Sequence, residues 1–241
     1  MRTSGLVLLL ALVVVSASFA AQTATYDVYA GWNMVGCPLV PFNPAPTDMM
    51  TFTGVFDPLD IEWTGSLQRW DSPTQSMIAY TMFDPGAFGN CLLGDGYWLN
   101  QAANGTVQYT GVDDGVPDSL GNMTDMWVSL PGDQTDGLDN GGWNLISHPF
   151  NHATTFDKTM FSFLGDNILV TDGTVTKTLA DAAAAGWLEE PFQYWNGATQ
   201  NMETAGYFFA TDDRMRGGQG YWVKTKKDNL ALIIPCDLPT F

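Results

Sequence analysis

The chain has 241 residues, of which 26 are acidic and 9 are basic, so its formal net charge at pH 7 is −17. Nucleic acids and anionic lipids are bound mainly through Lys and Arg, and this charge balance excludes both as expected partners. The length suits two domains of about a hundred residues, each large enough for one modest hydrophobic core.

Residues 1–20 have the composition of a secretory signal peptide. Arg2 precedes an apolar run over residues 6–15, and small residues lead to an expected cleavage after Ala20. A bilayer-spanning helix needs about 20 apolar residues, and this run is shorter. We therefore expect a secreted or cell-surface protein with no membrane insertion.

The chain contains an internal duplication. Residues 31–39 (GWNMVGCPL) return as residues 142–150 (GWNLISHPF). Two further pairs follow in the same order: LQRWD at 67–71 with FQYWN at 192–196, and GDGYWL at 94–99 with GQGYWV at 218–223. We therefore expect two homologous modules, residues 21–111 and 124–241, joined by an acidic linker over residues 112–123.

The first module is predicted to begin with a β-hairpin over residues 25–37, with its turn at Ala30 and Gly31. Thr47 and Asp48 are expected to cap a short helix over residues 49–52, matched in the second module by residues 155–164. Four short strands are expected at residues 55–63, 66–70, 77–83 and 106–110.

In the second module, residues 126–130 take the place of the first strand, and the following loop has grown to residues 131–141. Residues 179–185 (LADAAAA) give the strongest helix signal in the chain. Everything else has the pattern of strands and turns. The predicted fold class is mainly β, with two homologous antiparallel modules, sandwich or barrel-like, each with one short helix.

Three cysteines occur in a chain that is expected to be exported. Cys37 and Cys91 both lie in the first module, and their aligned positions in the second hold His148 and Met215. The joint loss of two cysteines is what a bonded pair predicts, so a disulfide between Cys37 and Cys91 is expected. Cys236 is then left for an intermolecular bond or for burial in the last strand.

Four tryptophans recur at equivalent places in the two modules: Trp70, Trp98, Trp195 and Trp222. Strand periodicity places each of them on the more polar face of its strand. They are expected to pack beneath loops or between the modules as a secondary core. The alternative is a sugar-binding platform, because flat indoles beside Gln, Asn and Asp suit the apolar faces and hydroxyls of a glycan.

Two acidic loops are candidate calcium sites. Residues 113–118 resemble a shortened thrombospondin type 3 calcium repeat. In the second loop, oxygen ligands stand at close spacing on Asp133, Asp136, Asp139 and Asn140. Calcium takes about six to eight oxygens, but neither loop has EF-hand spacing, and Asp-Gly turns also occur without metal. The expected cofactor is therefore none or calcium.

The residues give little support for catalysis. His148 and His152 are the only histidines, and Pro149 between them prevents the single helical face of a zinc-binding pair. The chain has no Gly-x-Ser-x-Gly motif, and chance carboxylate pairs are expected among 26 acidic residues. We therefore expect a protein that is not an enzyme.

The repeated motifs resemble the Gly-Trp-Asn to Gly-x-Gly-Tyr-Trp modules that occur in tandem in exported and cell-surface proteins of bacteria. The resemblance covers residues 24–236 and implies an extracellular location without a catalytic role. Such modules usually accompany other extracellular domains, whereas this chain has two modules alone. We therefore expect a secreted structural or interaction protein that associates with itself or with other extracellular proteins. The alternative is a carbohydrate-binding module with polysaccharide as its partner.

Overall fold

The computed structural model describes residues 21–46, 50–53, 66–81, 83–113, 124–156, 168–206 and 210–236. The predicted signal peptide, the predicted strand over residues 55–63 and most of the predicted linker lie outside these residues. Within them the fold is mainly β with antiparallel sheets, as predicted. No helix in this part of the chain is both long and apolar enough to span a membrane.

The first module contains two four-stranded sheets. One consists of β8 (Gly105–Val112) and the three strands that pair with it, β1 (Gln22–Val28), β3 (Val40–Pro41) and β4 (Met50–Thr53). The other has the order β2 (Gly31–Gly36), β7 (Gly96–Gln101), β5 (Leu67–Asp71) and β6 (Ser76–Ala79). The 3-10 helix η1 (Ser72–Thr74) joins β5 to β6, and α3 (Pro85–Phe88) follows.

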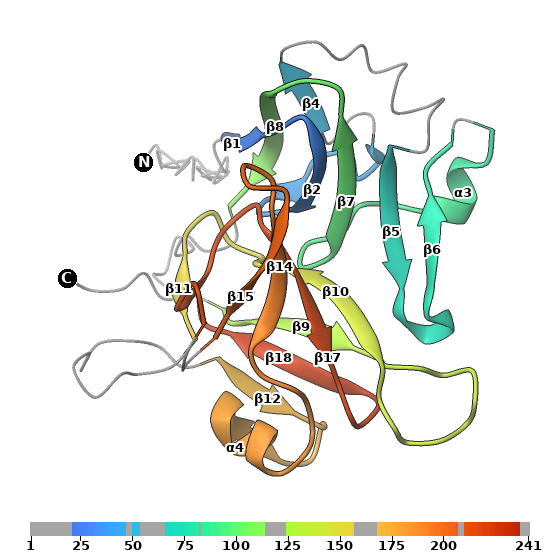
Figure 1. Cartoon of the computed structure of the whole chain (residues 1–241), viewed down its shortest axis with the longest axis vertical. Coiled ribbons are helices and arrows are strands. Elements are labelled where there is room, and N and C mark those ends of the chain that lie inside the picture. Colours follow the sequence, from blue (N-terminus) through green and yellow to red (C-terminus); the bar gives the residue numbers. More distant parts are fainter. Residues whose placement is uncertain are drawn as a thin grey trace, which may run out of the picture.

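The second module repeats this plan in the lower part of Figure 1. One sheet has the order β10 (Trp143–Ser147), β17 (Gly220–Lys224), β14 (Phe192–Asn196) and β15 (Asn201–Ala205). The other has the order β13 (Thr176–Thr178), β12 (Leu169–Thr171), β18 (Leu230–Ile234) and β9 (Met126–Leu130). A two-stranded pair, β11 (Thr154–Thr155) with β16 (Arg214–Met215), and α4 (Leu179–Ala184) complete it.

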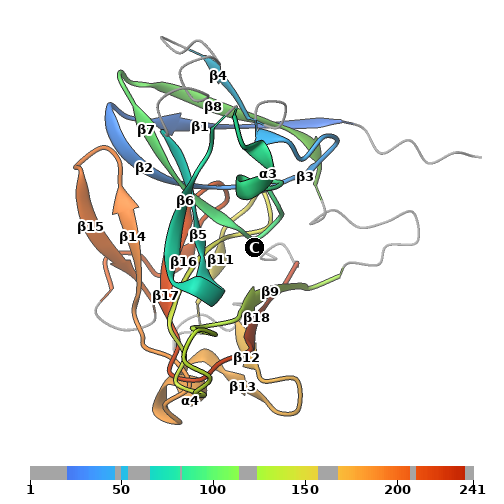
Figure 2. The same cartoon turned by 90° about the vertical axis from the view of Figure 1, so that its right-hand side faces the viewer.

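Each module has its own hydrophobic core between its two sheets. In the first module the core draws on both sheets, with Val28 and Val107 from one and Leu67 and Tyr97 from the other. The second core is built in the same way. The alternate residues Trp98 and Trp222 stay partly exposed on the opposite face, as strand periodicity predicts. These faces bring β2 beside β14, as Figure 2 shows.

The predicted hairpin over residues 25–37 is wrong. β1 pairs with β8, and β2 pairs with β7, so the chain crosses from one sheet to the other at Ala30 and Gly31. Asn33 holds this crossing, because its Oδ1 accepts from Tyr29 N (2.9 Å) and its Nδ2 donates to Tyr29 O (2.8 Å). The Asn of the Gly-Trp-Asn motif therefore serves the backbone of a sheet-to-sheet crossing.

The predicted helix over residues 49–52 is also wrong, since β4 occupies Met50–Thr53 and pairs with β8. Backbone pairing with a neighbouring strand outweighs a local capping signal there. The matching prediction over residues 155–164 lies mostly outside the described residues. The helix predicted over residues 179–185 is confirmed as α4, which begins after Thr178; the Thr178 side chain accepts from Asp181 N (3.1 Å).

Candidate functional site

The two modules meet through backbone hydrogen bonds at equivalent positions. Gly36 N donates to Gly218 O (3.0 Å), and the aligned Ser147 N donates to Gly94 O (2.7 Å). Gly94 and Gly218 are themselves aligned in the repeated motifs. The modules are therefore related by an approximate two-fold axis that passes between β2 and β10.

Small residues let the sheets approach closely at this axis. A Cβ on Gly36 would overlap the Cβ of Ser147, and a Cβ on Gly96 would lie 2.5 Å from Ile146 O. The aligned Ser147 keeps its side chain, and its buried Oγ has no hydrogen-bond partner in the described part of the chain. Only one member of the Gly36 and Ser147 pair can therefore carry a side chain.

Two glutamines make reciprocal contacts between the modules. Gln75 of the first module accepts from Trp143 N (2.8 Å) and donates to Trp143 O (2.9 Å). Gln200 of the second module accepts from Trp32 N (3.1 Å) and donates to Trp32 O (2.9 Å). Both glutamines stand in hairpin turns with positive φ, +50° and +52°. We call these the glutamine contacts.

Beside each glutamine contact lies a cluster of three tryptophans. Trp32 packs on Trp98 (ring centroids 5.9 Å apart), and Trp98 packs on Trp195 of the second module (5.7 Å). We call these three residues the open cluster. The aligned set consists of Trp143, Trp222 and Trp70, with centroids 6.0 Å and 5.2 Å apart, and we call it the covered cluster.

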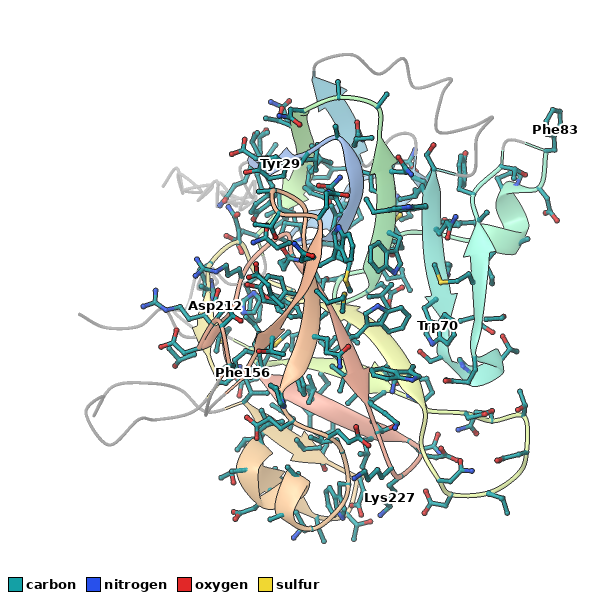
Figure 3. The ribbon with its side chains drawn as sticks, in the orientation of Figure 1. Tyr29, Trp70, Phe83, Phe156, Asp212 and Lys227 are labelled. Atoms are coloured by element: carbon teal, nitrogen blue, oxygen red, sulfur yellow. The ribbon has the colours of Figure 1, made fainter. Side chains whose placement is uncertain are left out.

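The covered cluster is closed by polar contacts. Trp70 Nε1 donates to Trp143 O (2.8 Å), and Lys224 Nζ lies 5.7 Å from the ring centroid of Trp143. Glu189 holds this lysine, with Oε1 3.2 Å from Nζ. Figure 3 shows Trp70 on β5, on the side that faces β10 and β17.

No charged side chain of the described residues lies over the open cluster, which lines a shallow groove of about 320 Å³. Five uncharged side chains line it: Trp32, Trp98, Trp195, Gln68 and Met77. Asn100, opposite Trp32 in the β2–β7 register, is aligned with Lys224, which stands opposite Trp143. The four tryptophans predicted as a site are therefore divided between two clusters, and only Trp98 and Trp195 line the groove.

The other functional residues were missed by sequence reasoning. Trp32 and Trp143 belong to the repeated Gly-Trp-Asn motif, but their cross-module partners are far away in the chain. Gln75 and Gln200 had a signal, because residues 70–77 (WDSPTQSM) and 195–202 (WNGATQNM) share a Trp, a Thr-Gln pair and a Met at the same spacing. Extending the repeat alignment through these turns would have found them.

A larger cavity of about 410 Å³ lies between the modules and includes Tyr26, Tyr194 and Arg216 in its lining. Several of its polar side chains are bonded within the protein: Tyr26 Oη donates to Asn151 Oδ1 (2.5 Å), and Tyr194 Oη donates to Glu203 Oε2 (2.6 Å). Arg216 forms an ion pair with Asp212. The smaller groove, in contrast, presents uncharged aromatic surface.

The predicted calcium ligands serve the loop itself. Asp133 Oδ1 accepts from Thr135 Oγ1 (2.6 Å) and from Thr135 N (2.8 Å), and these two hydrogen bonds lower the pKa of Asp133. Asp136 accepts from Asn140 Nδ2 (2.7 Å), and Asp139 accepts from Asp228 N (2.7 Å). Among the described residues, no group of three or more His, Cys, Asp or Glu side chains is placed to hold a metal ion. Most of the other predicted loop, residues 114–118, lies outside them.

The predicted Cys37–Cys91 disulfide is not present, since Cys37, Cys91 and Cys236 are all buried thiols that form no disulfide bond. Burial raises the pKa of Cys37 to about 12 and also raises the pKa of Cys91, so both remain protonated within the first core. Such thiols pack as small apolar side chains. Cys37 Sγ donates to Leu39 O (3.0 Å), a contact that the second module makes with His148.

His148 is fully buried and bonded on both ring nitrogens. Nδ1 lies 3.0 Å from Phe150 O, the residue aligned with Leu39, and Nε2 lies 2.9 Å from Thr154 Oγ1. Burial lowers the pKa of His148 to about 3, so the ring is neutral. His152 stacks on Phe150 with ring centroids 5.3 Å apart. Both histidines therefore pack against or bond to neighbouring residues of the second module.

Comparisons with known proteins gave no match: no family model, no curated protein sequence and no solved structure matches this chain.

Proposed function

We propose that this protein is a secreted, non-catalytic structural or interaction protein of the cell exterior that associates with copies of itself. One observation carries the proposal, an apolar row across the outward face of the second module. In register on β12, β18 and β9 stand Leu169, Ile233 and Trp127. Trp127 is the most exposed of the three, at 59%.

The first module has a polar row at the equivalent place. Thr25 on β1 pairs with Gln108 on β8. Polar side chains are the ordinary occupants of an outward sheet face, so the change to Leu, Ile and Trp marks one face of one module. A solvent-facing apolar row of this kind is typical of a contact surface.

The strong negative charge of the chain limits where a second copy can bind to a neutral part of the surface. Two acidic molecules repel each other over most of their surfaces, and a neutral apolar row is where they can meet without placing like charges together. A two-fold contact would place each Trp127 against the row of the other copy. β9 is also an edge strand of its described sheet, so its backbone adjoins the same surface.

Light scattering on the protein after removal of residues 1–20 tests this proposal over a concentration series. The expected result is a monomer that converts to dimers or larger species as concentration rises. Trp127→Thr, which introduces the residue of the first module, should weaken association by about tenfold or more, because central aromatic side chains dominate interface energies.

Leu138→Thr is the matched control, since Leu138 is 61% exposed but lies in the loop after β9. It should associate like the unaltered protein. A monomer at every concentration would contradict the proposal, as would equal weakening by both substitutions.

A further inference from the structure

We propose that the groove at the open cluster binds a neutral saccharide, with a pyranose ring stacked on the indoles of Trp32, Trp98 and Trp195. This site is separate from the apolar row on β9, β18 and β12. It therefore stands or falls independently of self-association.

The lining of the groove determines the class of ligand. All five lining residues are uncharged in a chain whose net charge is −17. An anionic ligand is repelled by the rest of the surface. A cationic ligand would be held by the indole faces alone, because the lining has no carboxylate to form an ion pair with it. The expected ligand is therefore uncharged.

Stacking and hydrogen bonding narrow this class to sugars. Indole rings offer flat apolar area, which suits the C–H face of a pyranose, and a polar amide side chain, Gln68, lies beside them in the lining. The volume of about 320 Å³ is at the lower end of the range of roughly 300–1,000 Å³ for ligand sites. The groove therefore accommodates a short part of a saccharide chain.

The covered cluster shows that joining the modules does not require an open groove. It has the same three aligned tryptophans and the same kind of glutamine contact, yet Lys224 lies over Trp143. At the open cluster the aligned residue is Asn100, which is too short to cover Trp32 in this way. The same framework is thus closed at one end and left accessible at the other.

The main test changes these two positions one at a time and leaves the tryptophans of both clusters in place. Binding of the hexasaccharides cellohexaose, xylohexaose and mannohexaose is measured by titration calorimetry and by tryptophan fluorescence. The unaltered protein should bind at least one of them. Asn100→Lys should weaken this binding by about tenfold or more, because the lysine covers a stacking face.

Lys224→Asn is the matched exchange. It should leave the affinity of the open cluster unchanged, and any sugar that binds at the uncovered Trp143 should appear in the titration as a separate second site. Trp127→Thr should also leave saccharide binding unchanged, which separates this proposal from self-association. Melting temperatures of all four variants, Trp32→Ala included, check that each is folded. Trp32→Ala is a second way to remove the stacking face, and it should abolish binding.

Three results would overturn the proposal. The first is no heat and no fluorescence change with any of the three neutral hexasaccharides. The second is unchanged binding by folded Asn100→Lys. The third is a fluorescence change that depends on protein concentration without any sugar and disappears in Asn100→Lys, because the groove would then receive a second copy of the chain.

Discussion

The open and covered clusters have the same tryptophans in the same arrangement and differ in what lies on them. At the covered cluster, Lys224 lies over Trp143 and the indole of Trp70 is hydrogen-bonded to the Trp143 carbonyl. At the open cluster, Asn100 replaces the lysine, and the buried Nε1 of Trp195 has no partner among the described residues. A duplicated interface can therefore hold two modules together at both ends and still leave one end accessible.

Other aligned positions near the approximate two-fold axis also differ between the two modules. Gly36 faces Ser147, Cys37 is aligned with His148, and Gln75 is aligned with Gln200. Each pair holds equivalent positions with different surroundings or different side chains. Substituting one member for the other tests which differences the fold depends on.

The largest expected effect comes from Gly36→Ser, which puts serine on both sides of the axis. A side chain at Gly36 would overlap Ser147 Cβ, so the sheets must move apart, and overpacking of this kind lowers the free energy of unfolding by about 3 kcal/mol. Urea unfolding measures the loss.

The exchange variant Gly36→Ser with Ser147→Gly is the control, because it restores one side chain and one glycine at the axis. It should recover most of the lost stability. An unfolding midpoint for Gly36→Ser alone that equals that of the unaltered protein would show that the sheets are not held at this spacing.

The next prediction concerns how the free energy of unfolding changes as the pH is lowered, which is where His148 should differ from the aligned Cys37. The pKa of His148 is lowered from 6.5 to about 3 in the folded protein by burial. Between these values the unfolded chain binds a proton that the folded chain does not, so stability falls as pH falls through this window. Above pH 6.5 both states are neutral, and the stabilising difference is fully present. From pH 7 to pH 5 the loss is roughly 2 kcal/mol.

His148→Cys introduces the first module's residue and can retain the contact with Phe150 O, as Cys37 does with Leu39 O. The free energy of unfolding measured from pH 7 to pH 5 should then be flatter than in the unaltered protein. His152, whose pKa is also lowered by burial, contributes with the same sign in both proteins, so some slope remains. Identical slopes would mean that His148 is protonated in the folded state.

A smaller effect distinguishes the two glutamine contacts. Gln200→Ala leaves both the N–H and the carbonyl of Trp32 without their glutamine partner, whereas after Gln75→Ala the carbonyl of Trp143 still accepts from Trp70 Nε1. We expect a loss of about 2 kcal/mol for Gln200→Ala and about 1 kcal/mol for Gln75→Ala. Both glutamines have positive φ, so the backbone cost of alanine is the same and cancels in the comparison. If urea unfolding shows a larger loss of stability for Gln75→Ala than for Gln200→Ala, the Trp70 hydrogen bond does not compensate for the loss of Gln75, and the prediction is wrong.

The features of the fold that could be predicted from the sequence are those that depend on residues close together in the chain. The mainly β class and the helix at Leu179–Ala184 follow from strand periodicity and an alanine-rich run. The partly exposed face for Trp98 and Trp222 follows from the period of two residues in a strand.

What failed depends on contacts between distant residues. The short turn at Ala30 and Gly31 is compatible with a hairpin or with a crossing between sheets, and only the pairing of β1 with β8 decides it. The same holds for the site: Gln200 meets Trp32 from 168 positions away, and no local pattern contains that contact. The disulfide prediction failed for another reason. Cys37 is aligned with the neutral His148, which makes the same backbone contact, so the loss of Cys37 from the second module does not require that it had a bonded partner.

The smallest expected effect compares Trp70→Phe with Trp195→Phe, which remove aligned indole N–H groups. Trp70 Nε1 is bonded to Trp143 O, so its loss should cost about 1 kcal/mol beyond the change in size. Trp195 Nε1 is buried without a partner among the described residues, so replacing this N–H with apolar ring removes a desolvated donor and costs less. Both substitutions remove a similar amount of aromatic surface, and urea unfolding of the pair isolates the hydrogen bond. Equal losses would mean that the Trp195 indole has a partner equivalent to the Trp143 carbonyl, and that the two clusters differ only in the residues that cover them.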